Sequence, residues 1–114
     1  NYDIARSGWI GDYSDPYNFL ECFLSGNGNN RTGYASDQYD RLVRKGASIL
    51  HKEGRLATYQ QAEALLLQDA PIIPIYFYTR PYLKSPDVRN WQPNHLGYIS
   101  WKTLYLEPAA EAAR

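Results

Sequence analysis

Two apolar stripes with helical spacing, separated by Lys52-Glu53-Gly54, occupy the middle of this 114-residue sequence. The first stripe follows Ser36, a residue type typical of helix N-caps, and comprises Tyr39, Leu42, Val43, Ala47 and Leu50. The second runs from about Arg55 to Gln68 and comprises Leu56, Tyr59, Ala62, Leu65 and Leu66. It should stop there, because Pro71 disfavours the helical conformation at the residue before it. We therefore expect two antiparallel helices joined by a short turn.

A shorter helix is expected before this pair. Asp15 can cap it and Pro16 suits its first position, and the apolar side chains that follow at helical spacing are Phe19, Leu20, Phe23 and Leu24. The glycine-rich stretch 25–33 then ends the helix. Cys22 lies within this apolar run and has no second cysteine to pair with, so we expect a buried free thiol.

The remaining segments favour extended structure. Residues 2–10, 71–83 and 101–107 are predicted strands, and the turn-rich stretch 84–100 has room for one more short strand. Three prolines confine the segment 71–83 to a sheet edge or to an irregular strand. Residues 108–114 are predicted to be a flexible tail. The order of elements predicts a mixed α/β fold for residues 1–107.

Charge and composition exclude several functions. Lys and Arg together number 12, as do Asp and Glu, so the chain lacks the basic surplus that nucleic-acid binding requires. No apolar run is long enough to span a membrane. His51 and His95 have no partners at ligand spacing, so surface histidines are expected, with no metal or cofactor. An enzyme is the least favoured interpretation, because no oriented nucleophile is evident and no acid is distinguished among Asp12, Asp15 and Glu21.

The stretch "RSGWIGDYSDPYNFL", residues 6–20, points instead to a binding surface. Asp12 lies close to Trp9 and Tyr13, and a carboxylate partly withdrawn from water needs a cationic partner. Arg6 could be that partner. A ligand ammonium is the alternative, with a charge-assisted hydrogen bond contributing about 1.5–3 kcal/mol. The residues alone leave both readings open.

Several spaced motifs then resemble a known family. "ARSGWIGDYSDPYNFL", "NN-x3-Y", "YDRL", "DAPIIPIYFY" and a closing "LY" are similar to the C-terminal part of bacterial extracellular dipeptide/oligopeptide-binding proteins, the peptide/nickel class of ABC-importer solute-binding proteins. The resemblance implies a periplasmic or extracellular receptor with two lobes, which closes around a short peptide and delivers it to an ABC permease in the membrane. It also implies an α/β fold: part of a periplasmic-binding-protein-like lobe, with about three helices packed on a small mixed sheet.

The resemblance also assigns roles to individual residues. Asp12 occupies the position that pairs with the α-ammonium of the peptide, and Trp9 would form a wall of a side-chain pocket. Arg6 would form a salt bridge with a carboxylate of the protein or the ligand. Tyr78 would donate its hydroxyl to the peptide backbone, with Tyr76 as a secondary candidate.

Two departures from the family bear on function. Ile10 stands where some members have a cysteine that is disulfide-bonded to an earlier residue, so that disulfide is absent here. Nickel- and haem-binding relatives share the scaffold, so Asp12 does not by itself identify the ligand. The chain would also supply only the last part of a receptor, so we expect it to bind peptides weakly alone and to self-associate. The alternatives are a carbohydrate-binding module that stacks sugars on Trp9, Trp91 or Trp101, or a self-associating scaffold without a ligand.

Overall fold

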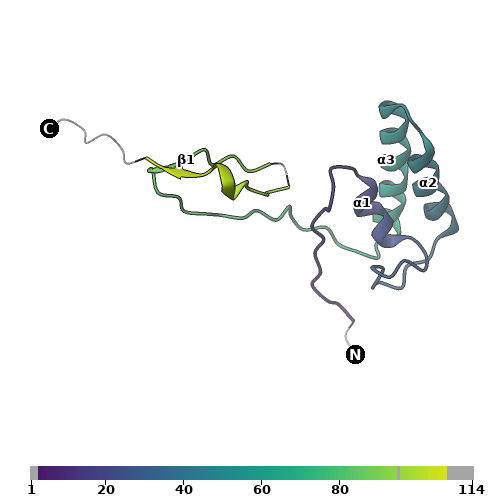
Figure 1. Cartoon of the computed structure of the whole chain (residues 1–114). Coiled ribbons are helices and arrows are strands. Elements are labelled where there is room, and N and C mark those ends of the chain that lie inside the picture. Colours follow the sequence, from purple (N-terminus) through teal and green to yellow (C-terminus); the bar gives the residue numbers. More distant parts are fainter. Residues whose placement is uncertain (1–2, 95, 108–114) are drawn as a thin grey trace. The chain divides into compact units, whose positions relative to one another are not determined.

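The chain forms two compact units, Asn1–Ile75 and Tyr76–Arg114, which are described separately. The computed structural model describes residues 3–94 and 96–107 (Figure 1). His95 and the predicted tail 108–114 lie outside the described residues, so both expectations stay predictions.

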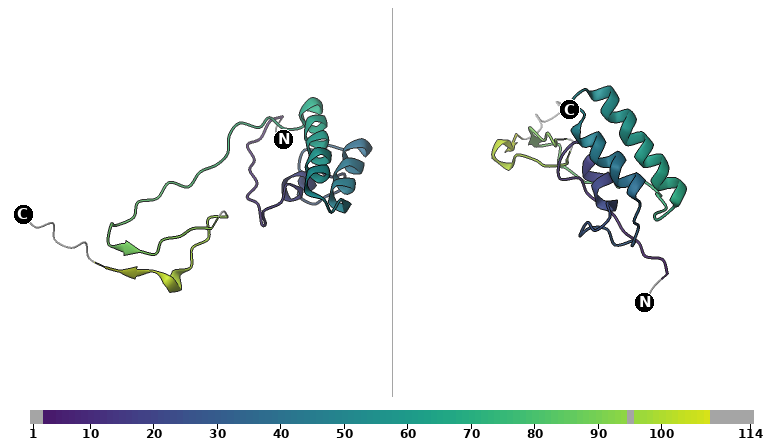
Figure 2. Two further views of the ribbon diagram at one scale, coloured as in Figure 1. Left: turned by 90° about the horizontal axis from the view of Figure 1, so that it is seen from above. Right: turned by 90° about the vertical axis from the view of Figure 1, so that its right-hand side faces the viewer.

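The first unit contains the three predicted helices. Helix α1 spans Tyr17–Leu20 and continues into a 3-10 turn, η1, at Glu21–Phe23. Helices α2 (Asp37–Ser48) and α3 (Lys52–Asp69) lie side by side and form the predicted hairpin (Figures 1 and 2). None of the helices in the described residues is long and apolar enough to cross a membrane.

Side-chain caps fix where these helices begin. The Ser36 hydroxyl accepts a hydrogen bond of 3.3 Å from the Tyr39 amide, which confirms the predicted cap. The Asp15 carboxylate accepts one of 2.8 Å from the Tyr17 amide and so caps α1, also as predicted. Helix α3 begins at Lys52, earlier than expected, because the Arg55 amide already donates to the His51 carbonyl at 3.1 Å. It ends at Asp69, where Ala70 adopts a left-handed conformation ahead of Pro71.

The core lies among α1, η1 and the α2–α3 hairpin. Its buried members include Leu20, Leu24, Tyr39, Val43, Tyr59, Ala62 and Leu66. Four predicted members are wrong: Phe19, Ala47 and Leu56 are exposed, and Leu50 is 99% exposed because it follows the last turn of α2. Gly46 takes a buried place instead, against the ring of Tyr59. Cys22 is a buried free thiol, as predicted, and its burial raises the pKa of the thiol.

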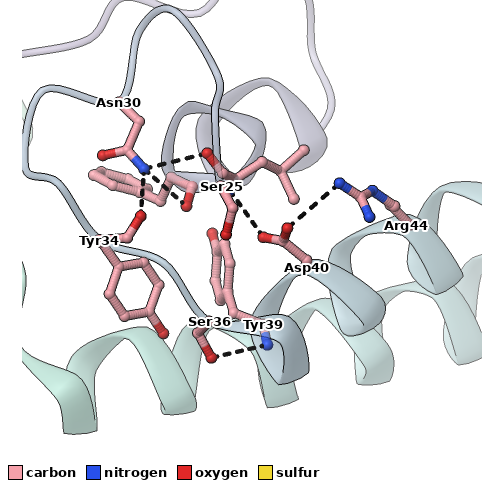
Figure 3. Close-up of polar contacts among 9 residues, drawn as sticks. Ser25, Asn30, Tyr34, Ser36, Tyr39, Asp40 and Arg44 are labelled. Carbon is pink, nitrogen blue, oxygen red and sulfur yellow. Dashed lines mark hydrogen bonds and ion pairs between the residues drawn. The ribbon is translucent and has the colours of Figure 1, made fainter.

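Polar contacts fasten the loop between η1 and α2 to the core (Figure 3). The Asn30 side-chain amide donates to the carbonyls of Phe23, Leu24 and Tyr34 at 3.3, 3.2 and 2.8 Å. The Asp40 carboxylate, itself buried, accepts a hydrogen bond of 3.0 Å from the Ser25 amide and pairs with Arg44 at 3.4 Å. These bonds satisfy backbone groups that a loop of this length would otherwise leave unpaired.

Buried tyrosines make the first unit sensitive to alkaline pH. The Tyr39 hydroxyl donates to the Leu20 carbonyl at 2.7 Å, and burial raises the pKa of both Tyr39 and Tyr59 above the ordinary value of 10.0. Above that pH the unfolded chain loses phenolic protons that the folded chain retains. The stability that these groups provide is therefore present below about pH 10 and is lost as the pH rises further.

The free energy of unfolding should accordingly fall above about pH 10, by about 1.4 kcal/mol per pH unit for each such tyrosine. Urea denaturation followed by circular dichroism between pH 9 and 11 would measure this slope. Tyr39→Phe should make the slope shallower, whereas Val43→Ala should lower stability equally at every pH. Equal slopes in the parent protein and Tyr39→Phe would contradict the assignment.

The second unit contains a two-stranded antiparallel sheet. Strands β1 (Val88–Arg89) and β2 (Tyr105–Leu106) pair with Val88 opposite Leu106 and Arg89 opposite Tyr105. The predicted short strand within 84–100 is therefore confirmed. Only the end of the predicted strand 101–107 is a strand, because Trp101–Thr103 form a 3-10 turn, η2.

The predicted strands at 2–10 and 71–83 are wrong for the described residues. Both segments are extended but belong to no sheet there, and Ile73, Ile75 and Phe77 are exposed. A strand needs a neighbour for its amide and carbonyl groups, and the prolines of 71–83 lack amide donors. The combination of helices and a small sheet agrees with the predicted mixed α/β class. The sheet is antiparallel rather than mixed, however, and in the described residues it lies in a different unit from the α-helices.

Candidate functional site

The predicted residues Trp9 and Asp12 lie on one loop, residues 9–13, which leads from the extended N-terminal segment towards α1. We call it the 9–13 loop. Trp9 is 41% exposed and Tyr13 is 44% exposed, and Asp12 is also exposed. An aromatic ring beside an exposed carboxylate offers an apolar surface and a negative charge together, which suits a ligand that carries both an ammonium and an apolar side chain.

A single buried side chain holds this loop on the helix. Asn18, in α1, is 1% exposed. Its Oδ1 accepts a hydrogen bond of 2.9 Å from the Trp9 indole Nε1 and one of 3.1 Å from the Asp12 backbone amide. Trp9 and Asp12 are thereby fixed to the same atom.

Two further contacts bring the 9–13 loop close to the helix. A Cβ at Gly11 would lie 3.1 Å from Cζ of Phe19, so the backbone approaches the Phe19 ring more closely than most side chains would permit. The Tyr13 hydroxyl donates to Oε1 of Glu21 at 3.1 Å. Desolvation by burial is the main cause that raises the pKa of Tyr13 above the ordinary value of 10.0.

Asp15 has a structural role. Besides capping α1, it forms an ion pair of 2.8 Å with Arg55 of α3. The Arg55 guanidinium in turn lies 5.3 Å from the centre of the Tyr59 ring. Asp15 is thus engaged by a cap and by a protein cation, whereas Asp12, on the 9–13 loop, is the acidic candidate for a ligand.

The other predicted site residues are not joined to this loop by the contacts above. Arg6 is exposed on the extended segment of the first unit, whereas Tyr78 belongs to the second unit. Tyr78 is exposed, and its ring lies 6.3 Å from that of Tyr76. The hydrogen bonds to Asn18 bring together Trp9 and Asp12.

Asn18 was missed by the sequence interpretation, which assigned the run "YNFLECFL" to an apolar helix face. The available signal was an amide side chain within a run of large apolar residues. A polar group that is withdrawn from water in this way requires hydrogen-bond partners. The sequence alone did not say that the partners would come from the 9–13 loop.

The alternative sites receive less support from the geometry. Within residues 3–94 and 96–107, no cluster of three or more His, Cys, Asp and Glu side chains could hold a metal ion. Of the proposed sugar-stacking residues, Trp91 is half-buried and packs against Tyr82 and Trp101, with ring centres 5.1 and 6.2 Å away. These two rings therefore cover part of the Trp91 ring surface on which a sugar would stack.

Comparison with known proteins identifies relatives over nearly the whole chain, although no protein-family model matches it. The chain is 39% identical over 101 residues to the dipeptide-binding protein DppE of Bacillus subtilis (strain 168), a match covering 89% of this chain and 19% of that protein. It is 32% identical over 108 residues to the oligopeptide-binding protein OppA of the same organism, covering 94% of this chain and 20% of that protein. It is 38% identical over 106 residues to the periplasmic oligopeptide-binding protein OppA of Haemophilus influenzae, a match covering 92% of this chain and 20% of that protein.

The chain thus spans about one fifth of the length of these relatives. The resemblance expected from "ARSGWIGDYSDPYNFL" and the later motifs is confirmed. The relatives are binding proteins rather than enzymes, in agreement with the expectation that no catalysis resides here.

Proposed function

Because this chain belongs to the family of bacterial dipeptide- and oligopeptide-binding proteins, we propose that it forms part of the peptide site in the solute-binding component of an ABC importer. The receptor acts in the periplasm or outside the cell and delivers short peptides to a membrane permease. Asp12 accepts hydrogen bonds from the peptide α-ammonium.

One observation carries this proposal: the Asp12 carboxylate is exposed, while its own backbone amide is fixed by the buried Asn18. The negative charge is therefore held at a defined place and remains available to a cation. The neighbouring acid, Asp15, is already paired with Arg55. A ligand ammonium that reaches Asp12 would gain a charge-assisted hydrogen bond.

Further roles follow for the remaining candidates. The partly exposed indole of Trp9 forms a wall beside the ammonium and packs against a peptide side chain. Arg6 forms a salt bridge with a carboxylate of the protein or of the ligand. Tyr78 donates its hydroxyl to the peptide backbone. These assignments rest on the family resemblance together with the exposure of each side chain.

Asp12→Ala tests the proposal in a full-length receptor that carries this segment. The variant should bind Ala-Ala-Ala about 10- to 150-fold more weakly, because it loses a charge-assisted hydrogen bond of about 1.5–3 kcal/mol. N-acetyl-Ala-Ala-Ala has no ammonium, so its affinity should change by less than about threefold. Isothermal titration calorimetry with both peptides gives the two ratios.

The matched control is Asp37→Ala, which removes the same charge from an exposed position in the first turn of α2. It should change both affinities by less than about twofold, since Asp37 belongs to α2 rather than to the 9–13 loop and salt screens exposed charges. If Asp12→Ala weakened the binding of both peptides by the same factor, the proposed role of Asp12 would be contradicted. In the same titration, the isolated 114-residue chain should bind more weakly than micromolar, because one wall of a cleft cannot desolvate a peptide.

A further inference from the structure

A buried amide in α1 connects the two residues of the 9–13 loop that face a ligand in the proposed function. Asn18 is 1% exposed, so its side chain does not contact a ligand directly. Its Oδ1 nevertheless bonds both the Trp9 indole and the Asp12 amide, at 2.9 and 3.1 Å. An amide buried in this way is costly unless its hydrogen bonds are made, so its partners are constrained in turn.

We propose that Asn18 is the positioning residue of the peptide amino-terminal site, acting on the ligand only through Trp9 and Asp12. The inference rests on the proposed function. With the Asp12 amide held by this bond, the peptide plane that leads into the Asp12 Cα is fixed, so fewer backbone and side-chain torsions remain to be ordered on binding. With the indole bonded to the same oxygen, the separation between the ring and the Asp12 backbone is also restricted. Preorganisation of this kind reduces the entropy lost when a ligand binds.

The other contacts of the 9–13 loop cannot replace this one. The hydrogen bond between Tyr13 and Glu21 is exposed, so water competes for both partners. The contact between Gly11 and Phe19 limits how close the loop can come, but it does not orient either functional side chain. Asn18 alone among these residues is buried and bonds both Trp9 and Asp12.

Asn18→Leu removes the acceptor and retains the approximate shape of the side chain. In a full-length receptor carrying this segment, it should weaken binding of Ala-Ala-Ala about 5- to 30-fold, the equivalent of one or two lost hydrogen bonds. Binding of N-acetyl-Ala-Ala-Ala should change by less than about threefold, because that peptide does not use Asp12.

The matched control is Thr58→Val, which also replaces a buried polar group by an apolar one of similar shape. The Thr58 hydroxyl donates to the Gly54 carbonyl at 2.8 Å, so the hydrogen bond that this variant removes lies within α3. This variant should lower thermal stability as Asn18→Leu does, yet leave the ratio of the two peptide affinities unchanged. A merely structural role for Asn18 would make the two variants behave alike.

A second measurement needs no variant and therefore does not depend on whether Asn18→Leu folds. In the 114-residue chain, hydrogen exchange of the Asp12 amide and the Trp9 indole, followed by NMR, should be slowed at least about tenfold relative to an unstructured peptide. Free exchange at both positions would overturn the positioning role.

The outcomes separate this inference from the proposed function. If the parent receptor does not distinguish Ala-Ala-Ala from its N-acetylated form, the proposed function fails, and the inference fails with it. If Asp12→Ala abolishes the distinction while a folded Asn18→Leu retains it, only the positioning role of Asn18 is overturned. If Asp12→Ala and Asn18→Leu both lose the preference for Ala-Ala-Ala over its N-acetylated form, while Thr58→Val keeps it, the result supports both the proposed function and the positioning role.

Discussion

Tyr39→Ala should lower the free energy of unfolding by about 3–5 kcal/mol, the range for truncating a large buried aromatic side chain. The Tyr39 side chain is fully buried, its ring packs edge-on against Tyr34 at 5.5 Å, and its hydroxyl donates to the Leu20 carbonyl at 2.7 Å. Truncation therefore removes the packing between α2 and α1 and leaves a buried carbonyl without this donor. A unit of this size has a total stability of only about 4–11 kcal/mol, so the variant should be largely unfolded on mild heating.

Thermal denaturation followed by circular dichroism would measure this effect. Tyr39→Phe separates the ring from the hydroxyl and should cost only about 1–3 kcal/mol. Leu50→Ala is the surface control: Leu50 is 99% exposed and its truncation should change stability by less than about 0.5 kcal/mol. A melting temperature for Tyr39→Ala that matches the Leu50 control would show that α1 does not pack on α2 as described.

Glycine-to-alanine substitutions at two helical positions should have opposite effects. At Gly46 a Cβ would overlap the Tyr59 ring, coming within 2.6 Å of its Cδ1, and that ring is buried and cannot move aside. Gly46→Ala should therefore destabilise the protein by about 1–3 kcal/mol, despite the better helix propensity of alanine. Each kcal/mol corresponds to about 4–8 °C in melting temperature for a domain of this size.

Gly54→Ala is the matched control. Its Cβ would meet only the end of the His51 side chain, which is exposed and can rotate away. The substitution should stabilise α3 by about 0.5–1 kcal/mol through propensity. Because the two variants contain the same residue change, a difference in sign isolates the contact between α2 and α3. A stabilising Gly46→Ala would mean that the helices lie farther apart than described.

The sequence predicted best where local chemistry determines structure. Ser36 and Asp15 cap their helices as expected, because a cap depends on neighbouring residues in the chain. The apolar stripes located Tyr39, Val43, Tyr59 and Leu66 in the core for a similar reason. The error at Leu50 arose at a helix end, where the periodic pattern continued past the last hydrogen-bonded turn.

Predictions that depend on distant partners succeeded less well. The segment 71–83 has β-branched and aromatic residues but no strand beside it in the described chain, and composition cannot reveal a missing neighbour. For the candidate site, Trp9 and Asp12 could be found from "GWIGDY", but their common acceptor could not. Asn18 lies on α1 rather than on the 9–13 loop, and its role depends on how that loop folds back.

The buried thiol of Cys22 has a practical consequence for studying ligand binding. Thiol-reactive dyes attack the thiolate, and burial both raises the pKa of this group and limits access to it. A cysteine introduced at exposed Ser7, close to Trp9, would therefore be labelled selectively at neutral pH while Cys22 stays in place. In a full-length receptor that carries this segment, a fluorophore attached there would test the proposed peptide binding while the native thiol remains unmodified.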